Sequence, residues 1–134
     1  MPIHLDRRDL INIQQMEVAV NGPDGATHLV ICTGVADLGS VGHETYTFLI
    51  GPQLSRRQFI GAIASGAIST IHTDDQNVTR DNDVEMGASL ILIEADYDDE
   101  SRQVRVSAQV SSRNAMTKLA ISYNVSILAE MPIY

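Results

Sequence analysis

The sequence predicts a mainly β protein of the α+β class: an antiparallel β-sandwich or barrel of about six strands with one central helix, in the order three strands, helix, three strands. Three observations support this fold class. Apolar and β-branched segments are separated by short turns, two late segments alternate with period two, and one central segment has apolar residues at helical spacing. A chain of 134 residues fits one domain, residues 1–134.

The first half of the chain predicts three strands. Residues 11–20 are rich in β-branched side chains and lead into NGPDG at 21–25, where Gly, Pro and Asp favour a chain reversal. The returning segment 28–39 is apolar at both alternating sets of positions, and 45–51 forms a third strand that Pro52 ends. Short turns between successive strands favour antiparallel pairing.

The second half predicts three more strands, at 87–97, 104–111 and 119–127, with a tight acidic turn at 98–101. Alternation in the last two strands places apolar side chains on one face. These residues are Val104, Val106, Ala108 and Val110, followed by Leu119, Ile121, Tyr123, Val125 and Ile127.

The central segment 55–71 predicts the helix. Ser55 is a suitable N-cap, and the apolar side chains that follow fall within one half of a helical circumference. The other half has only small or uncharged residues, and its two glycines each cost a helix about 1 kcal/mol. Those residues are Gln58, Gly61, Ala62, Ser65, Gly66 and Ser69. We interpret them as a second packing surface, against a loop of the same chain or another subunit; the alternative is an exposed polar face of low charge.

The same segment begins SRRQFI, which is similar to a twin-arginine export signal. Such signals are read at the N-terminus, where this chain has no apolar core of the required length. The apolar run 59–71 is also shorter than the roughly 20 residues that cross a bilayer as a helix. We therefore expect neither an N-terminal export signal nor a membrane partner, and we expect Arg56 and Arg57 to pair with carboxylates.

Composition limits the classes of partner. The net charge is −8 and Lys118 is the single lysine, so the basic surface that binds nucleic acid is missing. Cys32 is the single cysteine and lies in an apolar run, which favours a buried structural thiol, excludes an intramolecular disulfide and is consistent with the cytoplasm.

Two acidic groups are the candidates for chemistry. The segment 72–87 has carboxylates that could hold Ca²⁺ or Mg²⁺, but their spacing differs from that of an EF-hand loop, so we interpret it as a solvated loop or an assembly arm. Its candidate ligands are His72, Asp74, Asp75, Asp81, Asp83 and Glu85. Glu94 and Asp96 would share one side of a strand, as a catalytic carboxylate pair would, but the nearby acidic turn explains them equally well.

The four histidines, His4, His28, His43 and His72, form no metal-binding motif, and no nucleophile turn or phosphate loop is present. We therefore assign no catalytic, cofactor-binding or metal residue, and we expect a protein that is not an enzyme.

The uncharged central segment and the two-faced apolar strands favour a structural protein that assembles into a homo-oligomer or ring. In its layout of strands, helix, strands and a long loop, the chain resembles the ring-forming tube proteins of phage tails and related secretion systems. The resemblance implies sheets paired across subunits, a flanking helix and a place in a virion. The alternative is a soluble β-barrel domain that binds a small molecule or acts as an enzyme.

Overall fold

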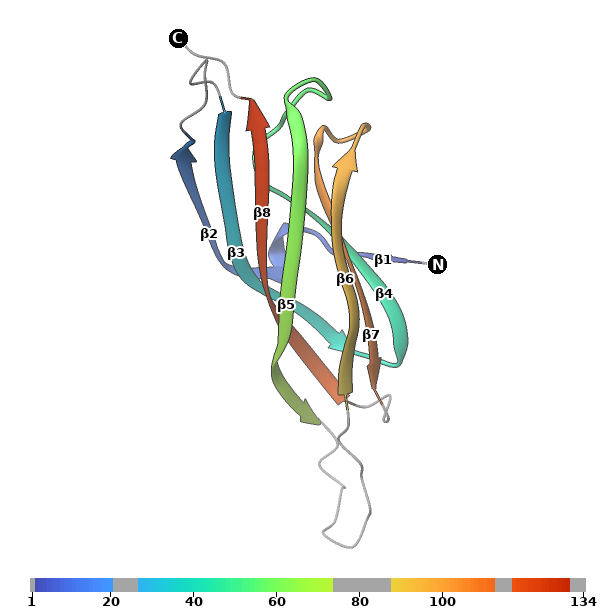
Figure 1. Cartoon of the computed structure of the whole chain (residues 1–134). Coiled ribbons are helices and arrows are strands. Elements are labelled where there is room, and N and C mark those ends of the chain that lie inside the picture. Colours follow the sequence, from blue (N-terminus) through green and yellow to red (C-terminus); the bar gives the residue numbers. More distant parts are fainter. Residues whose placement is uncertain (1, 21–26, 74–87, 113–116, 131–134) are drawn as a thin grey trace, which may run out of the picture.

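The computed structural model describes residues 2–20, 27–73, 88–112 and 117–130, and these residues form eight strands and one short 3-10 helix (Figure 1). The six segments predicted as strands are all strands, and the short β1 and the 3-10 helix near the N-terminus were not predicted. The elements are β1 (Ile3–His4), η1 (Arg7–Asp9), β2 (Leu10–Ala19), β3 (Thr27–Ser40), β4 (His43–Ile50), β5 (Phe59–Thr73), β6 (Ala88–Asp98), β7 (Gln103–Ser112) and β8 (Thr117–Glu130).

The strands form two four-stranded sheets, ordered β1-β4-β7-β6 and β2-β3-β8-β5. Among the described strands, the consecutive pairs β2-β3 and β6-β7 each stay within one sheet, and the chain changes sheet at the other five steps from one strand to the next. Pairing is antiparallel except between β1 and β4. Strands β5 and β6 lie side by side where the sheets meet, but no ladder joins them, so the described strands do not close into a barrel.

The core lies between the two sheets and is built by the alternation that the sequence predicts. The inward residues of β7 and β8, from Val104 and Leu119 onward, are almost fully buried. Strand β4 contributes Tyr46 and Phe48, and the Phe48 ring lies 4.9 Å from that of Tyr123, centroid to centroid. Because Phe48 and Tyr123 belong to different sheets, this contact helps to hold the sheets together.

The predicted central helix is wrong: residues 59–73 form β5, and no α-helix occurs among the described residues. Strand β5 pairs with β8 from Phe59 to Thr73, so the ladder satisfies its backbone on one side. Two bulges, after Phe59 and after Ile68, insert extra residues and break the period-two alternation. The sequence therefore lacks a clear strand pattern here, although its isoleucines and threonines favour a strand and its two glycines disfavour a helix.

The helix-start signal at Ser55 forms a real but single turn. The Gln58 side chain accepts a hydrogen bond from the Ser55 backbone N–H at 2.8 Å, which is one half of a capping box. The backbone N–H of Phe59 donates to the Ser55 carbonyl at 3.2 Å, and the chain then becomes extended. Local capping chemistry thus starts a turn, and pairing with β8 makes the residues after it a strand.

Candidate assembly surface

The side of the β2-β3-β8-β5 sheet that faces away from the core is formed by four rows of residues. Residues directly opposite one another in a ladder point to the same side of a sheet, and here they alternate with buried residues such as Val30 and Cys32. The rows are Val18-Leu29-Leu128-Gly61, Met16-Ile31-Ser126-Ile63, Gln14-Thr33-Asn124-Ser65 and Ile11-Val35-Ser122-Ala67. We call these residues the outer face.

No residue of the outer face is charged, although the chain has a net charge of −8. The charged residues of the same ladders, Asp37, Lys118 and Glu130, lie at the two ends of the sheet. Glu17 is in β2 but alternates to the other side, where its carboxylate lies 2.8 Å from His28 Nδ1. A sheet face exposed to water is usually polar or charged, so an uncharged face of this extent is a candidate for contact with another surface.

The outer face has both a protrusion and a hollow. The Ile63 side chain is 77% exposed and that of Met16 is 61% exposed, whereas the neighbouring row of short side chains is recessed. The shallow hollow is lined by Thr33, Ser65, Ala67, Ser122 and Asn124, with the backbone of Gly66 and Tyr123. A protruding apolar side chain beside an uncharged hollow is suited to packing against a complementary surface.

Strand β2 is the edge of this sheet that is least covered. Every residue from Ile11 to Ala19 is exposed, on both sides of the strand. Figure 1 shows β2 at the margin of the molecule, away from β4 and β7. An edge strand with exposed Ile, Met and Val side chains and one charged residue has little to prevent another strand from pairing with it.

The small residues of the central segment, which a helix would have placed together, separate onto two sides of β5. Gly61 and Ser65 belong to the outer face, and a Cβ built at Gly61 meets nothing within 4 Å. A Cβ at Gly66 would instead lie 3.0 Å from Ile93 Cδ1 of β6 and 3.0 Å from the Ser122 carbonyl oxygen. Gly66 therefore allows a close internal contact, and Gly61 lies in open space.

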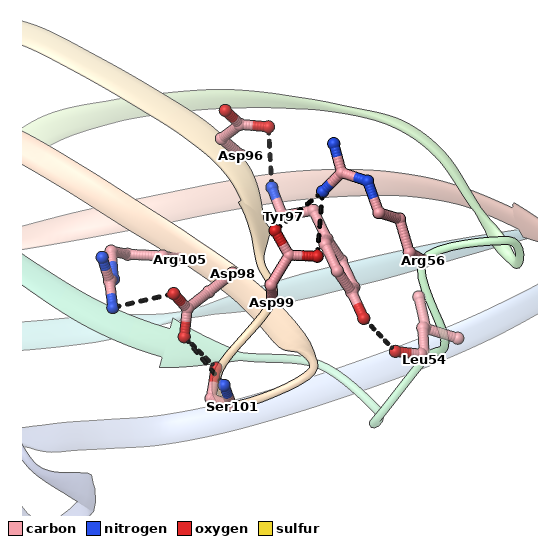
Figure 2. Close-up of polar contacts among 8 residues, drawn as sticks. All are labelled: Leu54, Arg56, Asp96, Tyr97, Asp98, Asp99, Ser101 and Arg105. Atoms are coloured by element: carbon pink, nitrogen blue, oxygen red, sulfur yellow. Dashed lines mark hydrogen bonds and ion pairs between the residues drawn. The ribbon is translucent and has the colours of Figure 1, made fainter.

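A cluster of ion pairs holds the turn before β5 against the turn between β6 and β7 (Figure 2). Arg56 Nη1 lies 3.0 and 2.9 Å from the two carboxylate oxygens of Asp99, as expected for this arginine, and its guanidinium lies 5.8 Å from the Tyr97 ring centroid. The Tyr97 hydroxyl donates to the Leu54 carbonyl at 2.6 Å. No carboxylate partner of Arg57 occurs within the described ranges.

The carboxylates of β6, Glu94, Asp96 and Asp98, line one hollow together with Arg105. Asp96 accepts a hydrogen bond from the Tyr97 backbone N–H, and Asp98 is bound by Ser101 and by Arg105 at 3.0 Å. These bonds with Ser101, together with the charge of Arg105, lower the pKa of Asp98. Glu94 is exposed on the same strand. The turn therefore accounts for Asp98, and the pairing of Glu94 with Asp96 stays a prediction.

Cys32 is buried, as the sequence predicts, and burial raises its pKa to about 11, so the thiol stays protonated at neutral pH. Most of the acidic segment 72–87, including Asp74, Asp75, Asp81, Asp83 and Glu85, lies outside the described residues, and only the backbone of His72 is placed, in β5. Within the part of the chain that the structure describes, no group of three or more His, Cys, Asp or Glu side chains could hold a metal ion.

Comparison with protein families, with curated proteins and with solved structures finds no match for this chain. Among the described residues, no helix has the length and apolar character needed to cross a membrane. Sequence reasoning identified an uncharged surface, but it missed the outer face itself, because the rows cross four strands and depend on the order β2-β3-β8-β5. The signal that could have found it is the absence of charge at alternate positions in each of these strands.

Proposed function

We propose that this protein is a non-enzymatic, single-domain assembly subunit that forms a homo-oligomer through the outer face. The observation that carries the proposal is the lack of any charge across sixteen ladder positions of a chain with net charge −8. Copies with this net charge repel one another over most of their surface. They can approach most closely where neither presents a charge.

A second copy suits this surface better than an unrelated partner, because the face has both a protruding apolar side chain and a hollow that could receive one. Ile63 protrudes, and the hollow around Ser65 and Ser122 can receive an apolar side chain without burying an unpaired charge. When two copies meet by a two-fold axis, each supplies the same patch, so Ile63 of each copy lies near the hollow of the other.

The exposed edge of β2 gives the proposal a second contact and a route to rings. Following the antiparallel ladders, β2 and β5 lie at opposite margins of one sheet and run in opposite directions. The open margin is β2, because β5 lies beside β6 of the same copy, and a neighbouring copy that placed a strand along β2 would continue the sheet. Repetition of such a contact closes a ring or builds a filament. A phage or virion component of the tail-tube type would take this form, and it would be found in the virion, or in the cytoplasm before assembly.

The flanking helix implied by the resemblance to tail-tube proteins is not present among the described residues, because the segment predicted as that helix is β5. The resemblance to tail-tube proteins is therefore no longer supported by a helix. The proposal depends on the outer face and the β2 edge, and the ring or virion form is its most specific version.

The test compares Ile63→Lys with Ile91→Lys by light scattering after gel filtration, at tens of micromolar protein. Both isoleucines are exposed residues of sheet-edge strands, at 77% and 58%, but Ile91 belongs to β6 in the other sheet. Each change adds one positive charge to an acidic chain, so general repulsion between copies falls equally in both variants. We expect Ile63→Lys to shift the mass to that of the monomer with the fold retained, and Ile91→Lys to keep the mass of the parent.

A parent protein that is monomeric throughout this concentration range would contradict self-assembly. Equal association of the parent and both variants would show that the outer face is not the contact. Circular dichroism melts of each variant separate loss of association from loss of folding.

A further inference from the structure

A cavity of about 430 Å³ opens beneath β2, and Gln14 is the one described residue that it shares with the outer face. The bulge between Ile11 and Gln14, where Asn12 adopts a left-handed φ of 54°, bends the strand beside η1 and leaves this space. Its apolar wall consists of Leu5, Leu10, Ile13, Leu49 and Ile50. Its size falls within the range of small-molecule sites, and it equals the liquid volume of about 14 water molecules.

One wall of the cavity includes a buried hydroxyl group without a hydrogen-bond partner. Tyr123 lines the cavity and is 3% exposed, and its hydroxyl is unpaired among the described residues. The ring lies close over Gly34, where a Cβ would approach the hydroxyl oxygen to 2.5 Å. Buried hydroxyl groups are normally bonded to protein or to a bound molecule, so this one indicates a missing partner at the cavity.

The rim of the cavity has both a positive and a negative side chain: Arg7 and Asp6 line it, and the Asp6 carboxylate is paired with Arg8 rather than with Arg7. Arg7 lines the cavity, is exposed, and forms no ion pair within the described ranges. The adjacent Arg8 differs, because its Nε lies 3.1 Å from Asp6 Oδ2. Burial and the proximity of Cys32 raise the pKa of Tyr123, while the charge of Arg7 opposes this rise, so the guanidinium acts on the tyrosine across the cavity.

We propose that the cavity binds a small amphipathic carboxylate. The alkyl part lies against the apolar wall, and the carboxylate is held between the Arg7 guanidinium and the Tyr123 hydroxyl, both of which donate to it. Apart from Gln14, which lines both, the binding site is separate from the outer face, and it does not depend on assembly.

The test uses octanoate, which has ten non-hydrogen atoms, and compares it with 1-octanol, which has the same chain length and no charge. Binding to the full chain is followed by NMR of methyl groups. We expect saturable shifts in the methyl groups of Leu10, Ile13 and Ile50, with octanoate binding at least tenfold more tightly than octanol. Shifts confined to Ile31 and Ile63 would mean adsorption to the outer face and would overturn the proposal.

Two matched variants test the head group. Arg7→Gln should raise the dissociation constant of octanoate about tenfold or more, whereas Arg8→Gln, one residue along and paired with Asp6, should leave it unchanged. Tyr123→Phe should weaken octanoate binding without lowering the melting temperature of the unliganded protein, since it removes a hydroxyl that has no partner there.

Three results would contradict the assignment. Octanol could bind as tightly as octanoate, Arg7→Gln could bind octanoate as well as Arg8→Gln does, or the protein could bind neither probe. A Tyr123→Phe variant that melts lower but binds octanoate unchanged would show that the hydroxyl is structural and would remove it from the site.

Discussion

Alanine substitutions at two glycines of β5 test the strand and its packing together. In an isolated helix, both Gly61→Ala and Gly66→Ala would stabilise the protein by up to about 1 kcal/mol. In the strand the two positions differ. Gly61 has open space around its Cα, whereas a Cβ at Gly66 would lie 3.0 Å from Ile93 Cδ1, 3.0 Å from the Ser122 carbonyl oxygen and 3.4 Å from Leu90 Cδ2.

The expected magnitudes are set by these contacts. The Ser122 oxygen is fixed in the β8 ladder and cannot move aside, so overpacking at Gly66 should cost about 1–3 kcal/mol. Either substitution also lowers the conformational entropy of the unfolded chain, which stabilises the folded protein by about 0.4–1 kcal/mol. We expect Gly66→Ala to destabilise by up to about 2.6 kcal/mol and Gly61→Ala to be neutral or stabilising by up to about 1 kcal/mol.

Urea unfolding followed by circular dichroism, with thermal melts as a second measurement, separates the two outcomes, since 1 kcal/mol corresponds to roughly 3–5 °C for a domain of this size. If Gly66→Ala were as stable as the parent or more stable, the close approach of β6 to β5 would be refuted. If both variants were stabilised equally, the helical interpretation of this segment would be favoured again.

Two further outcomes are expected. Asp98→Asn should be less stable than the parent at pH 7. The folded pKa of Asp98 lies below its ordinary value of 3.8, so the stability that its carboxylate contributes is complete above that value and is lost as the pH falls through the folded pKa. Urea unfolding should therefore show that the difference in stability between the variant and the parent vanishes in strong acid. A difference that persisted there would contradict this assignment. The Cys32 thiol, with a pKa of about 11, should resist a thiol reagent at pH 8 in the native protein and react after unfolding in urea; rapid native labelling would show that it is accessible.

Segments in which apolar and polar residues alternate without interruption could be predicted as strands, because the apolar side of each strand is the side that is buried. In β7 and β8 every second residue is apolar, and those residues are buried between the sheets. Strand β5 was not predictable in this way, because its bulges interrupt the alternation and Ser55 starts a genuine turn. The apolar spacing of this segment fits a helix, and its pairing with β8 overrides that local pattern.

The amino-acid sequence by itself determined that the protein is mainly β, which residues of β7 and β8 are buried, that Cys32 is a buried thiol, and that the central segment is uncharged. These properties depend on residue type and on near neighbours in the chain. Only the tertiary structure decided that Gly61 and Gly66 lie on opposite sides of a strand, that uncharged residues of four strands form one face, and that Arg7 and Tyr123 line one cavity. The reason is that strand order and register are set by pairing between segments far apart in the chain, and a side chain's neighbours across a sheet cannot be read from its neighbours along the sequence.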